Sequence, residues 1–244
     1  PEALMEGMAI LCVPEREDPR DVLVTKTGEG LFDLRAGSRV GTSSLRRAVQ
    51  LRRLRHDLAL GVVRGNVGTR LRKLDEGEHD AIVLAYAGLR RLGLDAERKL
   101  SILPIDQSLP AVGQGALALE GRADDTTLAA LLAPLEHEPT RIAVEAERAF
   151  LVRLHGSCST PLAAHARIAD GFLLMDAIVA SRVAEEAIQH ATTEPRAAGD
   201  AAARVRAARA LGERVADEVL ARGGARMIDA AKSAADPYAA LYAR

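Results

Sequence analysis

The residue of this sequence best suited to covalent chemistry is Cys158. It lies on the turn His155-Gly-Ser-Cys158, which follows a helical pattern over Glu147–Leu154, and Pro161 prevents the helix from resuming at once. A thiol on a glycine-flanked loop is reachable, and loops on rigid scaffolds often carry chemistry. An ordinary half-buried cysteine is the other interpretation, because free cysteine is among the most buried residue types.

A second group of residues forms a candidate anion site at a strand-to-helix turn. The predicted helix Leu45–His56 begins after a serine pair, and Ser43 or Ser44 is its natural N-cap. Free backbone N–H groups and the positive end of the helix dipole meet there. Arg46 and Arg47 add planar guanidinium groups, which suit carboxylate or phosphate. A solvated basic helix face is the alternative interpretation, which we accept for Arg52, Arg53 and Arg55.

Two further turns repeat this pattern. The predicted strand Leu58–Val63 is followed by the glycine-rich turn Arg64–Arg70, and the predicted strand Asp80–Ala85 by Tyr86–Arg91. Glycine lets the backbone approach a ligand closely. In a parallel sheet, ligands bind beyond the carboxyl ends of the strands. We therefore expect three polar turns, at Thr42, Arg64 and Tyr86, to converge on one cleft.

The alternation of strands and helices in the first half predicts an α/β domain with a mainly parallel sheet. Asp21–Thr25 and Ser38–Thr42 are further strands of this sheet. The apolar run Met8–Val13 predicts a strand buried on both faces, which places Cys12 in the interior. The Pro/Gly-rich segment Ser108–Gly115 predicts a crossover and hinge before an apolar strand at Ala116–Glu120.

The second half predicts a small α+β domain. Helices are expected at Asp125–Leu132 and His137–Leu154. Asp170-Gly171 joins two strand patterns, Ala163–Ala169 and Phe172–Ala180, and Asp-Gly is a strong hairpin signal. The apolar stripe of Ala201–Ala221 predicts a long helix that Gly223-Gly224 ends.

Composition excludes several classes of protein. Charged residues make up 27% of the 244 residues and the net charge is −1, so no overall field favours nucleic acid or an anionic membrane. Two cysteines far apart form no disulfide framework and predict a reducing, cytoplasmic setting. No run is long and apolar enough to span a bilayer, and no metal-ligand pattern is found.

The segment around Cys158 resembles the cysteine signature of the porphobilinogen deaminase (hydroxymethylbilane synthase) family. Eleven residues fill its fixed places: Glu147, Arg148, Phe150, Leu154, Gly156, Ser157, Cys158, Thr160, Pro161, Leu162 and Ala163. Four more segments are similar to family motifs in the same order: Glu15–Asp21, Gly41–Arg47, Arg64–Arg70 and Leu109–Gly115. Together they extend over nearly the whole chain.

The resemblance implies an enzyme of tetrapyrrole (haem) biosynthesis. Such a transferase joins four porphobilinogen units head to tail and releases ammonia, giving hydroxymethylbilane on a covalent dipyrromethane cofactor. Carried over, Cys158 attaches the cofactor through a thioether. The residues that match the family's cofactor and substrate contacts are Thr42, Ser43, Ser44, Arg46, Arg47, Arg64, Arg70 and Arg91. Arg90, beside Arg91, is the other candidate for the last place.

The resemblance also predicts how the chain is divided. Pro1 resembles the proline after the family's Ser-x-Lys-Asp-Val segment, so the catalytic aspartate is expected before residue 1, and we expect no turnover by this chain alone. Residues 1–19 and 115–132 would be a remnant of the first domain, with strands near Met8 and Ala116 left without partners. Residues 20–110 would form a periplasmic-binding-protein-like α/β domain and residues 137–244 the α+β domain. A monomer is expected when the protein is full length.

Two other functions fit parts of the sequence. The α/β units and the Pro/Gly-rich hinge suit a solute-binding module in which arginines bind an anionic small molecule, but such a fold does not require Cys158. Nucleic-acid binding through Arg46–Arg55 fits poorly, because net charge is slightly negative and aromatic residues are only 2% of the chain.

Overall fold

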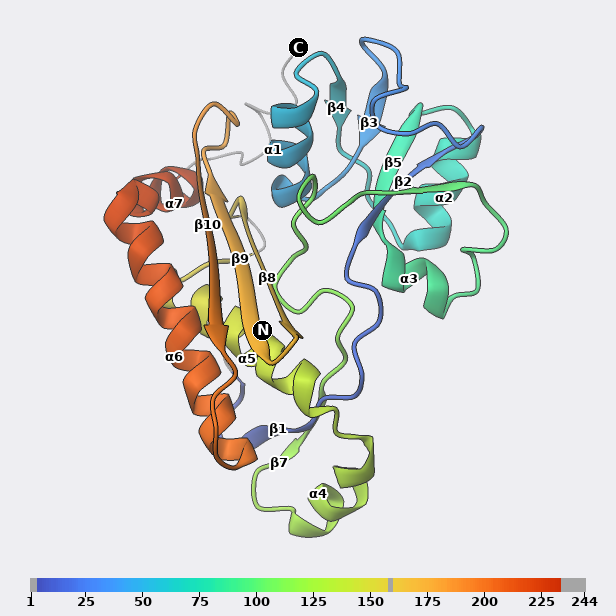
Figure 1. The fold of residues 1–244 in the computed structure, drawn as a ribbon. Coiled ribbons are helices and arrows are strands. Elements are labelled where there is room, and N and C mark those ends of the chain that lie inside the picture. Colours follow the sequence, from blue (N-terminus) through green and yellow to red (C-terminus); the bar gives the residue numbers. More distant parts are fainter. Residues whose placement is uncertain (1–3, 158–159, 234–244) are drawn as a thin grey trace.

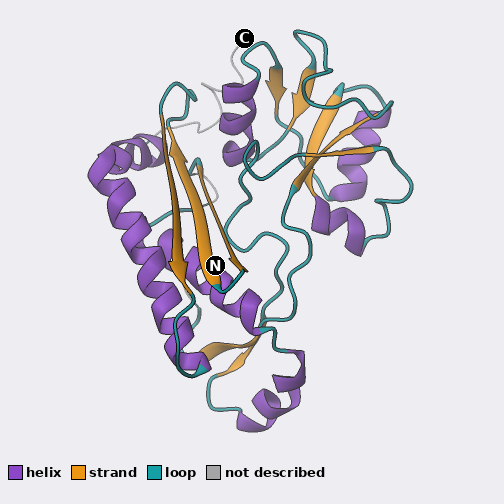
Figure 2. Ribbon diagram, in the orientation of Figure 1, coloured by secondary structure: helices purple, strands orange, loops and turns teal. Residues whose placement is uncertain are grey.

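A computed structural model describes residues 4–157 and 160–233 of the protein. Pro1 and Cys158 lie outside the described residues. Within the described ranges the strands form a five-stranded, a three-stranded and a two-stranded sheet. Helices cover the two larger sheets, as Figures 1 and 2 show.

The five-stranded sheet is mixed: four strands run in one direction, and β2 alone, which was not predicted to be reversed, runs against them. Its order is β4 (Ala59–Gly61), β3 (Arg39–Gly41), β5 (Ala81–Ala85), β2 (Asp21–Thr25) and β6 (Leu100–Ile102). Strand β3 runs parallel to β4 and β5, whereas β2 runs antiparallel to β5 and β6. A loop, not a crossover helix, joins β2 to β3, and an apolar run indicates burial without fixing direction.

Strand β2 is buried on both faces because helices cover both. Leu23 packs in one cluster with α1 (Leu45–Leu54), whereas Val22 and Val24 pack in another with α2 (Val67–Asp75) and α3 (Tyr86–Arg91). Successive strand residues point to opposite faces, which explains the alternation.

Helix α1 ends at Leu54, two residues before the predicted end. Arg55, expected to be solvated, instead donates hydrogen bonds to the carbonyl oxygens of Leu31 and Leu34 and to the carboxylate of Asp57. Arg55 therefore connects the loop that contains Leu31 and Leu34 to the C-terminal end of α1.

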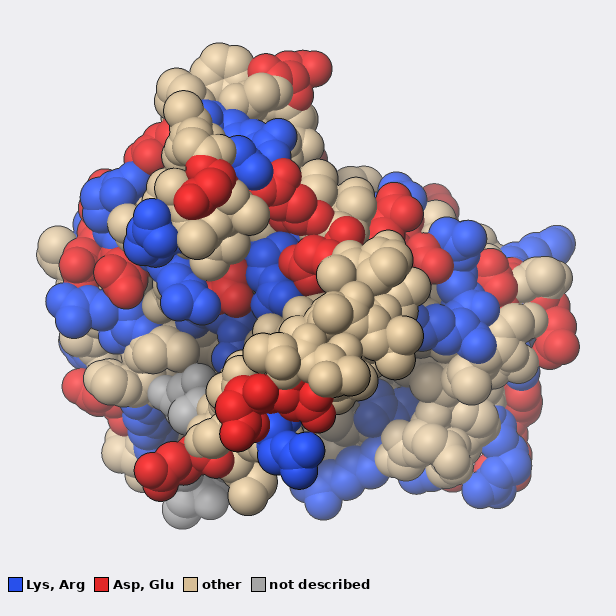
Figure 3. All heavy atoms as spheres, turned by 90° about the horizontal axis from the view of Figure 1, so that it is seen from below, with Lys and Arg blue, Asp and Glu red and all other residues tan. Residues whose placement is uncertain are grey.

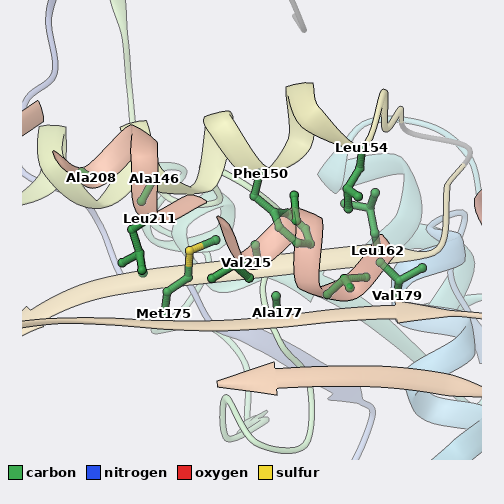
Figure 4. Close-up of a cluster of buried hydrophobic side chains, with 14 of the residues drawn as sticks. Ala146, Phe150, Leu154, Leu162, Met175, Ala177, Val179, Ala208, Leu211 and Val215 are labelled. Carbon is green, nitrogen blue, oxygen red and sulfur yellow. The ribbon is translucent and has the colours of Figure 1, made fainter. Parts of the chain in front are cut away.

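The three-stranded sheet is the predicted hairpin, β8 (Leu162–Ala169) and β9 (Phe172–Ala180), extended by β10 (Ala187–Pro195). Asp170 and Gly171 both have left-handed backbone angles, with φ of 50° and 81°, as a two-residue turn of this kind requires. Helices α5 (Glu138–Arg153) and α6 (Ala201–Val219) contribute side chains to the core against this sheet, which Figure 4 shows.

The two helices approach so closely that Gly212 has no room for a side chain. A Cβ at this position would lie 2.0 Å from the carbonyl oxygen of Ala146. The long helix was predicted to end at Gly223-Gly224, and its regular course does end there. Gly223, with φ of 98°, makes a kink within residues 220–224, after which α7 (Ala225–Lys232) resumes the helical course.

The two-stranded sheet pairs β1 (Met8–Cys12) with β7 (Leu119–Arg122) in antiparallel register. The expectation that these segments lack partners was wrong, since each pairs with the other. Cys12 is fully buried as predicted, but the other residues of β1 are half-buried, so the strand is not covered on both faces. The short helices α4 (Thr126–Leu132) and η1 (Ala133–Leu135) follow.

Two connecting segments, residues 13–20 and 103–118, run side by side from the five-stranded sheet to the β1–β7 pair (Figure 1). The backbone N–H of Glu17 donates to the carbonyl oxygen of Gly115, at 3.1 Å. Gly115 has φ of 84°, and a Cβ there would lie 2.4 Å from the Glu17 oxygen. Positive φ at Gly113 and Gly115 prolongs the turn, so β7 starts at Leu119 and not near Ala116 as predicted.

Candidate functional site

The strand directions bring one carboxylate to the edge where the polar turns lie. Because β3, β4 and β5 are parallel, the turns at Thr42, Arg64 and Tyr86 follow strands that end at the same edge. Strand β2 runs the other way, so its first residue, Asp21, pairs with Ala85, the last residue of β5. Asp21 therefore lies beside the start of α1.

Asp21 is fully buried and binds both arginines of α1. Arg46 donates from Nη1 to Oδ2 at 2.7 Å and from Nη2 to Oδ1 at 3.2 Å. Arg47 donates from Nε to Oδ1 at 2.9 Å. Ser108 Oγ and Gln114 Nε2 complete the set, at 2.7 and 3.0 Å, from the second connecting segment. One carboxylate thus joins β2, α1 and the connection between the sheets.

The charges in this cluster determine what it can still bind. Burial raises the pKa of Asp21, but the charges of Arg46 and Arg47 and their hydrogen bonds outweigh it, so the pKa lies below its usual value. Asp21 is therefore ionised and offsets one of the two cations. We expected both guanidinium groups to bind carboxylate or phosphate of a ligand at the cap, and in the structure they bind the carboxylate of Asp21. Arg46 keeps one buried donor, Nε, without a partner among the described residues.

The serine turn before α1 forms as predicted. Ser44 is the N-cap, with its side chain accepting a hydrogen bond from the Arg47 N–H. Ser43 Oγ donates to the Val63 carbonyl oxygen, and Thr42 Oγ1 accepts from the Ser44 N–H at 3.2 Å. These bonds tie the turn to the neighbouring strand end and hold its hydroxyl groups in place.

A cavity of about 660 Å³ extends from this turn to Ser157 and Thr160, which flank Cys158 in the sequence. Ser43, Ser44 and Arg46 line it on the side of α1, and Ser157 and Thr160 line it on the side of the loop. Cys158 itself lies outside the described residues, but it follows Ser157 directly. The cavity therefore connects the predicted anion turn with the neighbours of the predicted attachment residue.

The other predicted arginines do not line this cavity. Arg64 is exposed and makes no hydrogen bond or ion pair with the described part of the chain. Arg70 donates from Nε to the Gly65 carbonyl oxygen at 2.7 Å, and its charge helps to lower the pKa of Arg47, after burial as the main cause. Arg91 donates to the Gly115 carbonyl oxygen at 2.7 Å.

Sequence reasoning missed a second buried carboxylate, Glu147 of α5, which has no exposed surface. Arg16 binds it in bidentate fashion at 2.6 and 3.2 Å. The backbone N–H groups of Gly113 and Ala166 donate to it at 2.6 and 2.8 Å, and His165 Nδ1 lies 3.5 Å away. Glu147 thus joins both connecting segments to β8 and α5.

Glu147 is a structural carboxylate and not a proton donor. Burial raises the pKa of Glu147. The contact with His165 and the charge and hydrogen bonds of Arg16 lower it by more, so the pKa lies below its usual value. The only advance sign was its place in the cysteine signature, beside Arg148. Asp21 also lies in a segment similar to a family motif, Glu15–Asp21, but the sequence pattern predicted only that a strand begins there and not that its carboxylate is buried.

The surface and the remaining composition add no competing site. Figure 3 shows basic and acidic side chains interspersed on the face seen from below. Among residues 4–157 and 160–233, no helix is long and apolar enough to cross a membrane, and no cluster of His, Cys, Asp and Glu could hold a metal ion.

Comparisons with known proteins agree over almost the whole chain. Residues 1–130 match the family model "Porphobilinogen deaminase, dipyromethane cofactor binding domain", and residues 141–221 match "Porphobilinogen deaminase, C-terminal domain". The chain is 48% identical over 229 residues to a porphobilinogen deaminase of Syntrophobacter fumaroxidans, covering 94% of this chain and 71% of that protein. Identity is 47% over 230 residues to the porphobilinogen deaminase of Syntrophotalea carbinolica (94% and 70% covered) and 49% over 222 residues to that of Desulforudis audaxviator (91% and 71%).

Proposed function

The chain belongs to the porphobilinogen deaminase family, and from this premise we propose how its residues serve the family's reaction. That reaction joins four porphobilinogen molecules head to tail, releases ammonia at each addition and yields hydroxymethylbilane. The chain is therefore assigned to the transferases of tetrapyrrole biosynthesis. A solute-binding module is not favoured by any of these similarities.

The cavity fits the dipyrromethane cofactor of the family. Its volume of about 660 Å³ lies within the range of small-molecule sites, roughly 300–1,000 Å³. The unpartnered Nε of Arg46 and the hydroxyl group of Ser44, which accepts from the Arg47 N–H and still carries a proton to donate, suit a ligand with carboxylates. The cofactor supplies a covalent primer, which keeps the growing chain on the protein.

We assign the attachment to Cys158. Its neighbours Ser157 and Thr160 line the cavity. Cys12, the other thiol, has no exposed surface, and burial followed by the nearby carboxylate of Glu136 raises its pKa. Because the thiolate is the nucleophile, a buried thiol with a raised pKa is a poor attachment point.

The arginines around the turn edge bind the carboxylates of the pyrrole chain. Each porphobilinogen brings two carboxylates, so a growing oligomer is strongly anionic, and fixed guanidinium groups offset this charge and set its register. Exposed Arg64 is free to meet incoming substrate, and Arg70 and Arg91 extend the same edge. Arg46 and Arg47 act from the buried side, with Thr42, Ser43 and Ser44 beside them. The carboxylate that stabilises developing positive charge is assigned to neither Asp21 nor Glu147, since arginines hold both.

The observation that carries this proposal is the cavity joining the α1 turn to the neighbours of Cys158. The test is the intact mass of the protein after incubation with porphobilinogen. Cys158→Ser should lose the mass of the dipyrrole, whereas the matched Cys12→Ser variant should keep it. A dipyrrole still bound to Cys158→Ser, or bound at Cys12, would contradict the assignment.

A second test addresses the arginines. In the full-length protein, Arg46→Lys, Arg47→Lys and Arg64→Lys should each impair turnover, because a point charge does not reproduce a bidentate fork. Arg64→Lys is the most direct test, since the exposed side chain makes no hydrogen bond or ion pair with the described residues and the exchange should leave stability unchanged. Full turnover in all three variants would show that these arginines do not bind carboxylates.

We further propose that residues 20–110 and 137–244 form separate domains, and that residues 1–19 and 115–132 form a third part around β1 and β7. The separate sheets support this division. The α/β part is proposed to be of the periplasmic-binding-protein type. The protein is proposed to act as a cytoplasmic monomer without nucleic acid or membrane. The interspersed charges on the face seen in Figure 3 support the absence of a nucleic-acid site on that face.

A further inference from the structure

A basic residue outside the predicted set, Arg148, lines the same cavity from the other sheet's side. On α5, Val144, Arg148 and Leu151 follow at intervals of four and three residues, which places them on one side of the helix. All three line the cavity, and Arg148 is half-buried. The residue thus belongs to the wall of the cavity and not to the outer surface of α5.

The neighbour of Arg148 fixes this orientation. Glu147 does not line the cavity and is held by Arg16 and by the N–H groups of Gly113 and Ala166. A rotation of α5 that withdrew Arg148 would break these contacts of a fully buried carboxylate. The Glu-Arg pair therefore combines a structural anchor with a residue presented to the ligand.

The acidic residue in the cavity wall, Glu145, is neutralised by arginines that lie outside the cavity. Glu145 lines the cavity, but Arg209 binds it at 2.8 Å and Arg141 lies 3.8 Å from it. Neither of these arginines lines the cavity. The charge of Glu145 is therefore offset and does not repel an anionic ligand. Arg46 of α1 and Arg148 of α5 both line the cavity and would contact such a ligand.

We propose that Arg148 binds an acetate or propionate carboxylate of the pyrrole chain held in this cavity. This inference rests on the proposed function. Arg46 acts from α1 and Arg148 from α5, so the two guanidinium groups would bind one oligopyrrole from both sheets. Arg148 lies ten residues before Cys158 in the sequence and shares the cavity with Ser157.

The test uses binding and not turnover. Cys158→Ser protein cannot form the thioether, so its affinity for a soluble dipyrromethane with acetate and propionate side chains is measured by calorimetry. Adding Arg148→Gln should weaken this affinity about tenfold to a hundredfold, the range for loss of a hydrogen bond to a charged group. Arg148→Lys should lose less. Arg153→Gln, on the same helix but paired with Asp217 outside the cavity, should change nothing.

The methyl ester of the same dipyrromethane separates ligand binding from a structural role. If Arg148 binds carboxylate, Arg148→Gln weakens binding of the acid but leaves binding of the ester unchanged. Equal weakening of acid and ester, or no weakening of either, overturns the proposal while leaving the proposed function intact. If the Cys158→Ser parent binds neither compound, the proposed function itself fails, and this assignment fails with it.

Discussion

Replacing Asp21 by asparagine would remove the charge at the centre of the buried arginine cluster while keeping the size of the side chain. The carboxylate accepts from Arg46, Arg47, Ser108 and Gln114. An asparagine has one acceptor oxygen, so its NH2 group must face donors. If it takes the place of Oδ2, it faces Arg46 Nη1, which lies 2.7 Å from that oxygen in the protein.

The expected loss is large for a single atom exchange. Breaking a buried ion pair by removing one partner costs about 3–5 kcal/mol, because the remaining charge stays buried without compensation. Asp21 has no exposed surface, and Arg46 and Arg47 are 5% and 8% exposed, so solvent does not screen the cluster. Against a typical free energy of unfolding of about 5–15 kcal/mol, this is a substantial fraction.

Urea unfolding followed by circular dichroism measures the change. Asp75→Asn is the matched control, because Asp75 forms a bidentate pair with Arg98 but is about half exposed, and the same exchange there should cost about 0–1 kcal/mol. The folded-state pKa of Asp21 is lowered, so its contribution is present above the unfolded pKa of about 3.9 and is lost as pH falls below it. The difference in free energy of unfolding between the parent protein and Asp21→Asn should therefore become smaller in acid. A loss no larger than that of the control, or a gap independent of pH, would refute the reasoning.

Three further changes test other contacts. Arg16→Gln leaves Glu147 without its bidentate partner and should lower the free energy of unfolding by about 3–5 kcal/mol at neutral pH. The loss should be smaller in acid, because the lowered pKa of Glu147 means that its contribution to stability disappears as the carboxylate is protonated. Urea unfolding that shows no loss would contradict this. Gly212→Ala places a Cβ 2.0 Å from the Ala146 oxygen and should lower the thermal midpoint through a cost of about 1–3 kcal/mol or more, whereas an unchanged midpoint would contradict the close helix crossing. Ser44→Ala removes the N-cap of α1 and should cost about 0.5–2 kcal/mol in urea, with Ser44→Asp as the capping control; equal stability of the Ala and Asp variants would show that the cap contributes nothing.

Features with local causes could be predicted from the sequence. Asp170-Gly171 specified the β8–β9 hairpin because its two residues adopt positive φ at low cost. Ser44 specified the start of α1 because its hydroxyl accepts a backbone hydrogen bond there. The serine–arginine turn at α1 likewise follows from residues adjacent in the chain.

Features that depend on distant partners could not be predicted. The direction of β2 decides that Asp21 meets Arg46 and Arg47, but an apolar strand reads the same in either direction. Arg16 and Glu147 are 131 residues apart, and nothing near either residue indicates the other. The role of Arg148 in the cavity wall depends on this same pairing, since Glu147 sets the rotation of α5.

The shared acceptor at Glu147 has a consequence for hydrogen exchange. The amide of Gly113 belongs to the second connecting segment and the amide of Ala166 to a strand, yet both donate to the same buried carboxylate. Because each amide donates to the Glu147 side chain, exchange of either amide requires an opening that breaks its hydrogen bond to Glu147. Two amides 53 residues apart in the sequence should therefore show the same protection factor against exchange, as reporters of one opening event between the connecting segments and the three-stranded sheet.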